Sequence, residues 1–130
     1  MIEGVTIQFI VGDIRRASDW YTKVIGRGPD NTPYDDLIEW IITPAITIQV
    51  NGKGMHEQKG FSGRIRFAVD DIQEYRARII HELRVEISRL EEIRGVVRWC
   101  NFDDPWGNKL GYYQDLSRHK ENISEDLEFF

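Results

Sequence analysis

The sequence has 130 residues, of which 41% are hydrophobic and 12% aromatic, and its formal net charge is −5 at pH 7. This composition supports one folded domain without disulfides or a structural metal. It argues against nucleic acid as a partner, because phosphate binding needs a concentrated excess of Lys and Arg. No stretch approaches the roughly 20 apolar residues of a membrane span, and the start lacks the pattern of a signal peptide. With one cysteine, Cys100, in an apolar segment, we expect a cytoplasmic protein with a buried thiol and no membrane partner.

The first half of the chain predicts a strand, a helix and two further strands. Residues 5–11 alternate between apolar and other side chains, which is typical of a half-buried strand. Apolar residues at helical spacing follow Asp13, a natural N-cap, and Gly26 ends the predicted helix. Two apolar runs, 37–42 and 45–50, then predict strands separated by a turn.

The second half repeats this order. Residues 64–69 alternate like the first strand, and a second helical pattern begins after Asp71. Three short apolar runs follow, near 85–90, 96–102 and 108–114, and turn residues separate them.

The two halves also align in sequence. Residues 6–14 match residues 64–72 with five identities. The identical pairs are Ile7 and Ile65, Phe9 and Phe67, Val11 and Val69, Asp13 and Asp71, and Ile14 and Ile72. Two unrelated strand–helix pairs are the alternative, but the shared cap position and strand register favour a duplication.

We therefore predict a single domain over residues 1–115, built from two modules of about 1–52 and 63–115 with a linker at 53–62. The remaining residues, 116–130, form a charged tail, for which we expect a short helix that docks on the body or on a partner.

Three segments resemble the vicinal-oxygen-chelate superfamily, which includes glyoxalase I, bleomycin-resistance proteins and extradiol dioxygenases. They are Val11-Gly-Asp-Ile-Arg-Arg-Ala-Ser-Asp-Trp-Tyr-Thr-Lys-Val-Ile-Gly26, Phe67-Ala-Val-Asp-Asp-Ile72 and the turn Asp104-Pro-Trp-Gly-Asn-Lys-Leu110. The resemblance implies an α+β fold, in which two tandem βαβββ modules form a curved mixed sheet around a cleft, with the helices on the outer face. It also implies a homodimer.

Metal-dependent members of this superfamily bind a divalent ion in the cleft, and the resemblance places its four ligand positions at Thr6, Gln49, Arg64 and Gly111. Only Gln49 is a plausible ligand, since glycine has no side-chain donor and threonine is a poor ligand for these metals. The charge of Arg64 repels a cation. The three histidines lie in the predicted linker, helix and tail rather than on strand faces. We expect no metal and no other cofactor.

The alternation turns a polar set of side chains toward the predicted cleft. The candidate ligand-binding residues are Thr6, Gln8, Trp40, Thr47, Gln49, Arg64, Arg66, Gly111 and Tyr113. One interpretation is an anionic or oxygen-rich small ligand held by Arg64 and Arg66, with Tyr113 or Trp40 stacking on its apolar part. The alternative is that both arginines pair with an internal acid such as Glu39, or lie exposed to water.

These residues favour metal-free small-molecule binding, with no catalytic residue assigned. A metal-dependent lyase, isomerase or dioxygenase of the same superfamily is the first alternative. A dimerising structural module with a filled cleft is the second.

Overall fold

The computed structural model describes residues 2–52 and 64–117. The predicted linker and all but the first two residues of the predicted tail lie outside these described residues. The chain divides into two compact units, one of residues 1–63 with 104–108 and the other of residues 64–103 with 109–130. Among the described residues, no helix is long and apolar enough to cross a membrane.

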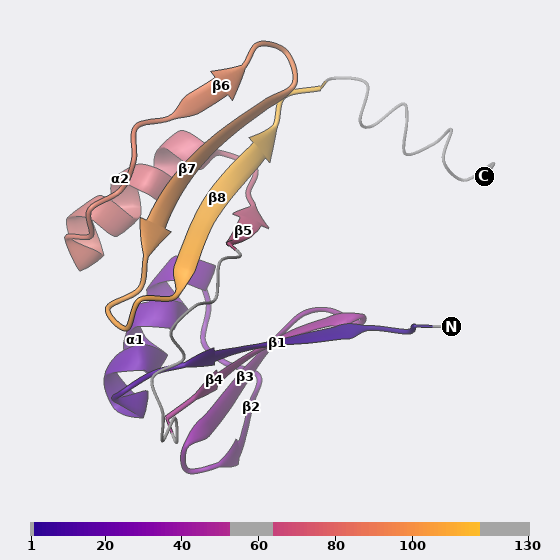
Figure 1. Cartoon of the computed structure of the whole chain (residues 1–130), viewed down its shortest axis with the longest axis vertical. Coiled ribbons are helices and arrows are strands. Elements are labelled where there is room, and N and C mark those ends of the chain that lie inside the picture. The colour runs from indigo at the N-terminus through magenta and orange to yellow at the C-terminus, as the bar shows by residue number, and fades with distance from the viewer. Residues whose placement is uncertain (1, 53–63, 118–130) are drawn as a thin grey trace. The chain divides into compact units, whose positions relative to one another are not determined.

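The first unit is one helix and one four-stranded sheet (Figure 1). Its elements are β1 (Val5–Ile10), α1 (Ile14–Ile25), β2 (Asn31–Tyr34), β3 (Leu37–Thr43) and β4 (Ile46–Asn51). The strand order is β1-β4-β3-β2, in which β1 runs parallel to β4 and the other neighbours are antiparallel. The connection from β1 to its parallel partner β4 runs through α1, β2 and β3, which gives the long crossover that parallel pairing requires.

The second unit has the same topology (Figure 1). Its elements are β5 (Ile65–Ala68), α2 (Ile72–Leu83), β6 (Glu91–Ile93), β7 (Val97–Asp103) and β8 (Lys109–Asp115). The strand order β5-β8-β7-β6, with β5 parallel to β8, repeats that of the first sheet. The prediction of an α+β fold made of two βαβββ modules is confirmed, with a separate four-stranded sheet in each module.

The predicted helix caps are also confirmed. The carboxylate of Asp13 accepts hydrogen bonds from the backbone N–H groups of Arg15 and Arg16, at 3.1 and 3.2 Å. Asp71 accepts from the N–H of Glu74 at 3.2 Å. These bonds satisfy donors that the first turn of a helix leaves without partners. Gly26 ends α1 with φ of 92°, a left-handed conformation that glycine adopts without a steric penalty.

Two strands differ from the prediction. The run 85–90 forms only an isolated bridge between Ile87 and Phe102, and the strand lies just after it, at β6. β2 was not predicted, because its side chains are exposed and include Pro33, which leaves no apolar alternation to read.

Aromatic side chains fill the core of the first unit. The Tyr21 ring stacks on Phe9 with centroids 5.5 Å apart, meets Trp20 edge-on at 5.0 Å and lies 6.2 Å from Trp40. Tyr21 and Trp40 are fully buried. The polar atoms of both rings have partners, since the Trp40 Nε1–H donates to the backbone oxygen of Arg27 at 2.9 Å and the Tyr21 hydroxyl donates to Asp104 at 2.7 Å. Burial of this cluster supplies much of the hydrophobic stabilisation of the unit.

The turn 104–108, which belongs to the first unit, is organised around one buried carboxylate. Asp104 accepts from the Tyr21 hydroxyl at 2.7 Å, from the side-chain amide of Asn108 at 2.6 Å, and from the backbone N–H groups of Trp106 and Asn108 at 2.9 and 2.7 Å. The Asn108 amide also donates to the backbone oxygen of Ile10 at 3.0 Å. Desolvation by burial raises the pKa of Asp104 above its ordinary value, although these hydrogen bonds act in the opposite direction.

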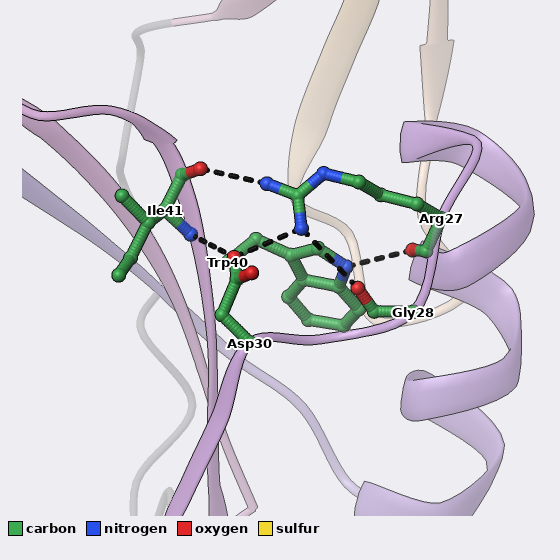
Figure 2. A network of polar contacts seen from close by, with 5 residues as sticks. All are labelled: Arg27, Gly28, Asp30, Trp40 and Ile41. Carbon is green, nitrogen blue, oxygen red and sulfur yellow. Dashed lines mark hydrogen bonds and ion pairs between the residues drawn. The ribbon is translucent and has the colours of Figure 1, made fainter.

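Hydrogen bonds among Arg27, Asp30 and Ile41, which we call the Arg27 clasp, hold the chain after α1 in place (Figure 2). One guanidinium nitrogen of Arg27 donates to Asp30 at 2.9 Å and the other donates to the backbone oxygen of Ile41 at 2.7 Å. The backbone N–H of Ile41 donates to the same Asp30 carboxylate at 2.6 Å. The hydrogen bond from Ile41 is the main cause of a lowered pKa at Asp30, and the bond from Arg27 adds to it.

Replacing Arg27 with Gln is expected to reduce the free energy of unfolding by about 1 kcal/mol, because it removes charge-assisted hydrogen bonds at a half-exposed site. The pKa of Asp30 should rise toward its ordinary value in the variant. Urea unfolding measures the first effect and an NMR titration of the carboxyl carbon measures the second. An unchanged Asp30 titration would show that the contact between Arg27 and Asp30 does not persist in solution.

Candidate functional site

The candidate residues fall into two groups, one in each unit, and each group is described separately. In each unit we call the sheet face that turns away from the helix the open face. Alternate residues of a strand point to opposite faces, so the buried core residues identify the helix-covered face and their neighbours lie on the open face.

Four of the predicted residues lie together on the open face of the first sheet. Thr6 pairs with Thr47, and Gln8 pairs with Gln49, in the parallel register of β1 and β4. The amide of Gln8 donates to the side-chain oxygen of Gln49 at 3.0 Å, and Gln49 donates to the carboxylate of Glu39 at 2.6 Å. Gln49, the best of the four implied metal-ligand positions, therefore uses both ends of its amide within a row of neighbouring side chains.

Trp40 lies on the other face of the same sheet. It pairs with Ile48 on β4, is fully buried and contacts Tyr21 of α1. The interpretation that Trp40 stacks on a ligand is therefore set aside. The alternation of β3 explains the difference, because Glu39 takes the open-face position that pairs with Gln49.

The other four predicted residues belong to the second unit. Arg66 pairs with Gly111, and Ala68 pairs with Tyr113, in the parallel register of β5 and β8. Arg64 immediately precedes β5 in the same alternation. The helix-covered face of this sheet carries Leu110 and Tyr112, which are fully buried, so these four candidates share the open face.

The two arginines have different surroundings. Arg64 donates to the backbone oxygen of Phe102 at 3.1 Å and to that of Leu110, and it lies 3.6 Å from the carboxylate of Asp103. Its charge and donors are thus directed to its own sheet. Arg66 donates through Nε to the side-chain oxygen of Asn101 at 2.9 Å and is exposed. Within 2–52 and 64–117, no carboxylate lies at ion-pair distance from Arg66.

Two open-face residues of β7 were not among the predicted candidates. Trp99 pairs with Tyr113, and Asn101 pairs with Gly111. Trp99 and Asn101 are half-buried, whereas Cys100 between them is fully buried. Burial raises the pKa of the Cys100 thiol, as expected for a structural residue rather than a nucleophile. The alternation of the run 96–102 contained the signal that assigns Trp99 and Asn101 to this face.

The residues at the four implied ligand positions do not fit a divalent metal. A Cβ atom at Gly111 would overlap the backbone oxygen of Cys100 and would lie 3.0 Å from Cγ of Arg66 and 3.2 Å from the side-chain oxygen of Asn101. The Arg66–Asn101 hydrogen bond thus crosses directly over the position that a ligating side chain would occupy. Arg64 brings a second permanent positive charge to the same face. The described part of the chain contains no group of three or more His, Cys, Asp or Glu side chains arranged to hold a metal.

Replacing Gly111 with Ala is expected to reduce the free energy of unfolding by about 1–3 kcal/mol, because the added methyl group displaces backbone and the Arg66–Asn101 pair. Thermal or urea unfolding measures the loss. Gly107→Ala is the contrast. Open space surrounds Gly107, so any loss of stability in that variant comes from its positive φ of 88° and not from steric overlap. A Gly111→Ala protein as stable as the parent would contradict the close packing described above.

No family model matches the sequence, and no curated protein is similar to it at the sequence level. Solved structures do match the fold. The glyoxalase/bleomycin resistance protein from Catenulispora acidiphila DSM 44928 gives a TM-score of 0.67 at 20% identity, over 85% of this chain and 96% of that chain. The genomically encoded fosfomycin resistance protein FosX from Listeria monocytogenes gives 0.71 at 20% identity, over 88% and 94% of the two chains. Lactoylglutathione lyase from Agrobacterium tumefaciens gives 0.63 at 14% identity, over 85% and 91%.

These proteins belong to the vicinal-oxygen-chelate superfamily, which the three sequence segments resemble. Identities of 14–20% establish a common fold and no more. The chain therefore has the fold of the glyoxalase/bleomycin resistance proteins, as the sequence resemblance predicted.

Proposed function

We propose that this protein binds a small anionic or oxygen-rich molecule without a metal ion, and that Arg66 is the group that binds the anion. The observation that carries the proposal is the contrast between the two arginines of the second open face. Arg64 is directed to an acid and two carbonyl oxygens of its own sheet, whereas Arg66 is exposed with one amide partner. A guanidinium on a sheet face is a good receptor for a carboxylate or phosphate, which it binds through paired N–H donors.

The neighbouring side chains support binding rather than catalysis. A guanidinium is a permanent cation, and the amide of Asn101 and the indole of Trp99 do not accept protons. General acid–base chemistry needs a group that exchanges a proton near the working pH. These three residues instead orient an anion and contact its apolar part.

The names of the structural neighbours suggest which ligands to test first. They include fosfomycin resistance, bleomycin resistance and lactoylglutathione lyase. Fosfomycin is a phosphonate and therefore an anion, whereas bleomycin carries cationic groups. The Arg66 guanidinium favours ligands of the first kind over the second.

Replacing Arg66 with Gln is expected to weaken anion binding by about 1.5–3 kcal/mol, or roughly 10- to 150-fold in Kd, because charge-assisted hydrogen bonds are lost. Isothermal titration calorimetry with a panel of small carboxylates, phosphates and fosfomycin measures this. Arg15→Gln is the matched control, since it removes the same charge from an exposed side chain of α1 in the first unit.

Elemental analysis of the purified protein tests the metal-free part of the proposal. Stoichiometric metal, together with activity that a chelator abolishes, would favour the alternative of a metal-dependent lyase, isomerase or dioxygenase. Anion binding that Arg66→Gln leaves unchanged would reject Arg66 as the receptor.

We further propose a cytoplasmic homodimer, a state that is common among proteins of this fold. Light scattering coupled to size-exclusion chromatography measures the mass in solution. A monomeric mass at micromolar concentration would reject this part of the proposal, and it would leave ligand binding untouched.

A further inference from the structure

The open face of the second sheet is ordered in rows that run across the strands. One row is polar and contains Arg66 on β5, Gly111 on β8 and Asn101 on β7. The next row contains Ala68 and Tyr113, two residues later on β5 and β8, and Trp99, two residues earlier on the antiparallel strand β7. A positive charge therefore lies beside a pair of aromatic rings on neighbouring strands.

Small residues alternate with large ones in these rows. Gly111 separates Arg66 from Asn101, and Ala68 lies beside Tyr113. The missing side chain at Gly111 allows the guanidinium of Arg66 to reach across to Asn101, which fixes the guanidinium over the polar row. Ala68 adds only a methyl group next to the Tyr113 ring.

The spacing of the rows suits a particular size of ligand. Neighbouring rows on one face lie about 7 Å apart, because each residue of a strand rises about 3.3 Å and alternate residues share a face. An aromatic ring joined to a carboxylate through one or two carbon atoms spans a distance of this order. Both ends of such a molecule meet a suitable partner on this face.

The charges around the two rows favour one orientation of a bound ligand. Arg66 uses Nε for Asn101, which leaves the two terminal nitrogens of its guanidinium as the pair of donors that a carboxylate binds. At the other end, Glu91 on β6 pairs with Trp99 in register and also forms an ion pair with Arg89 at 3.1 Å. A negative group is therefore favoured at the Arg66 end, whereas Arg89 already balances the charge of Glu91 beyond Trp99.

We infer that the ligand class is a flat aromatic monocarboxylate, with its carboxylate on Arg66 and its ring against Trp99 and Tyr113. This inference rests on the proposed function, because it names the kind of anion that the Arg66 face accepts. One guanidinium balances one carboxylate, and the aromatic row supplies apolar contact that inorganic anions and acetate cannot use.

Calorimetric or NMR titration with phenylacetate and acetate tests the inference on the full chain. Phenylacetate should bind at least about tenfold more tightly than acetate, since only phenylacetate gains the ring contacts. Trp99→Leu should weaken phenylacetate binding much more than acetate binding and so remove most of this difference. Trp99→Phe, which keeps an aromatic ring and perturbs the fold less, should retain part of it.

Trp106→Leu is the matched control, because it removes a half-buried tryptophan in the other unit, where the ring lies 5.5 Å from the Arg16 guanidinium. It should leave both affinities unchanged. Equal binding of acetate and phenylacetate, with both lost in Arg66→Gln, would overturn the aromatic inference and keep the proposed function. Absence of binding for every anion, or binding that Arg66→Gln does not alter, would overturn both.

Discussion

Replacement of Asp104 with Ala is expected to reduce the free energy of unfolding by roughly 3–5 kcal/mol, a large part of the stability of a domain of this size. The variant leaves the buried Tyr21 hydroxyl and the backbone N–H groups of Trp106 and Asn108 without their acceptor. Each buried donor without a partner costs about 1–3 kcal/mol. Chemical unfolding followed by tryptophan fluorescence measures the loss.

Tyr21→Phe is the matched control for this prediction. It removes only the hydroxyl that donates to Asp104 and keeps the ring in the aromatic core, so its effect should be smaller, at about 1–2 kcal/mol. Equal stability of Asp104→Ala and the parent would contradict the network.

The pH dependence of the free energy of unfolding, compared between the parent and Asp104→Ala, gives a second test of this network. Because the pKa of Asp104 is raised above 3.8 in the folded protein, the folded state binds more protons than the unfolded state between these two pKa values. The contribution of Asp104 to stability should therefore increase as the pH falls through the raised pKa, and it should be constant below 3.8. The stability difference between the parent and Asp104→Ala should widen over that interval.

Replacement of Trp40 with Ala is also expected to cost roughly 3–5 kcal/mol of stability, because it opens a cavity in the aromatic core and removes a buried hydrogen bond. Its ring is fully buried beside Tyr21, and its Nε1–H donates to Arg27. Anion affinity, measured by calorimetry where the variant is folded, should be unchanged.

Trp99→Leu should show the opposite behaviour, with a small change in stability and a loss of affinity for aromatic anions. Trp40→Phe, which keeps most of the ring volume, serves as the milder core variant for the affinity measurement. A loss of affinity in Trp40→Phe without a loss of stability would return Trp40 to the list of ligand-binding residues.

The fold was largely predictable from the sequence because its signals are local. Strand alternation, the change to helical spacing and the two aspartate caps each involve residues within a few positions of one another. The internal repeat then related the two halves, so that one assignment supported the other. β2 was not predicted because a short exposed strand with a proline has no apolar pattern. It forms by pairing with β3.

The candidate site was less predictable because it depends on pairing between distant segments. Arg64 and Arg66 look equivalent in sequence, and only the arrangement of Asp103 and two carbonyl groups around Arg64 distinguishes them. Trp40 was placed on the wrong face because apolar residues occupy both alternating sets of β3, and only the pairing of Glu39 with Gln49 on β4 shows which set lies on the open face.

The Arg27 clasp also has a consequence for behaviour at high concentration. β2 ends its pairing with β3 at Asn31, so the backbone N–H and oxygen of Ile41 lie past it, on an edge of the kind to which a strand of another chain can add. Asp30 and Arg27 take up both groups, and charged side chains at such a position discourage intermolecular sheet extension. Ile41 itself is 44% exposed, so loss of the clasp joins an apolar side chain to an unpaired backbone edge. We therefore expect the Arg27 clasp to reduce aggregation at this point of the sheet.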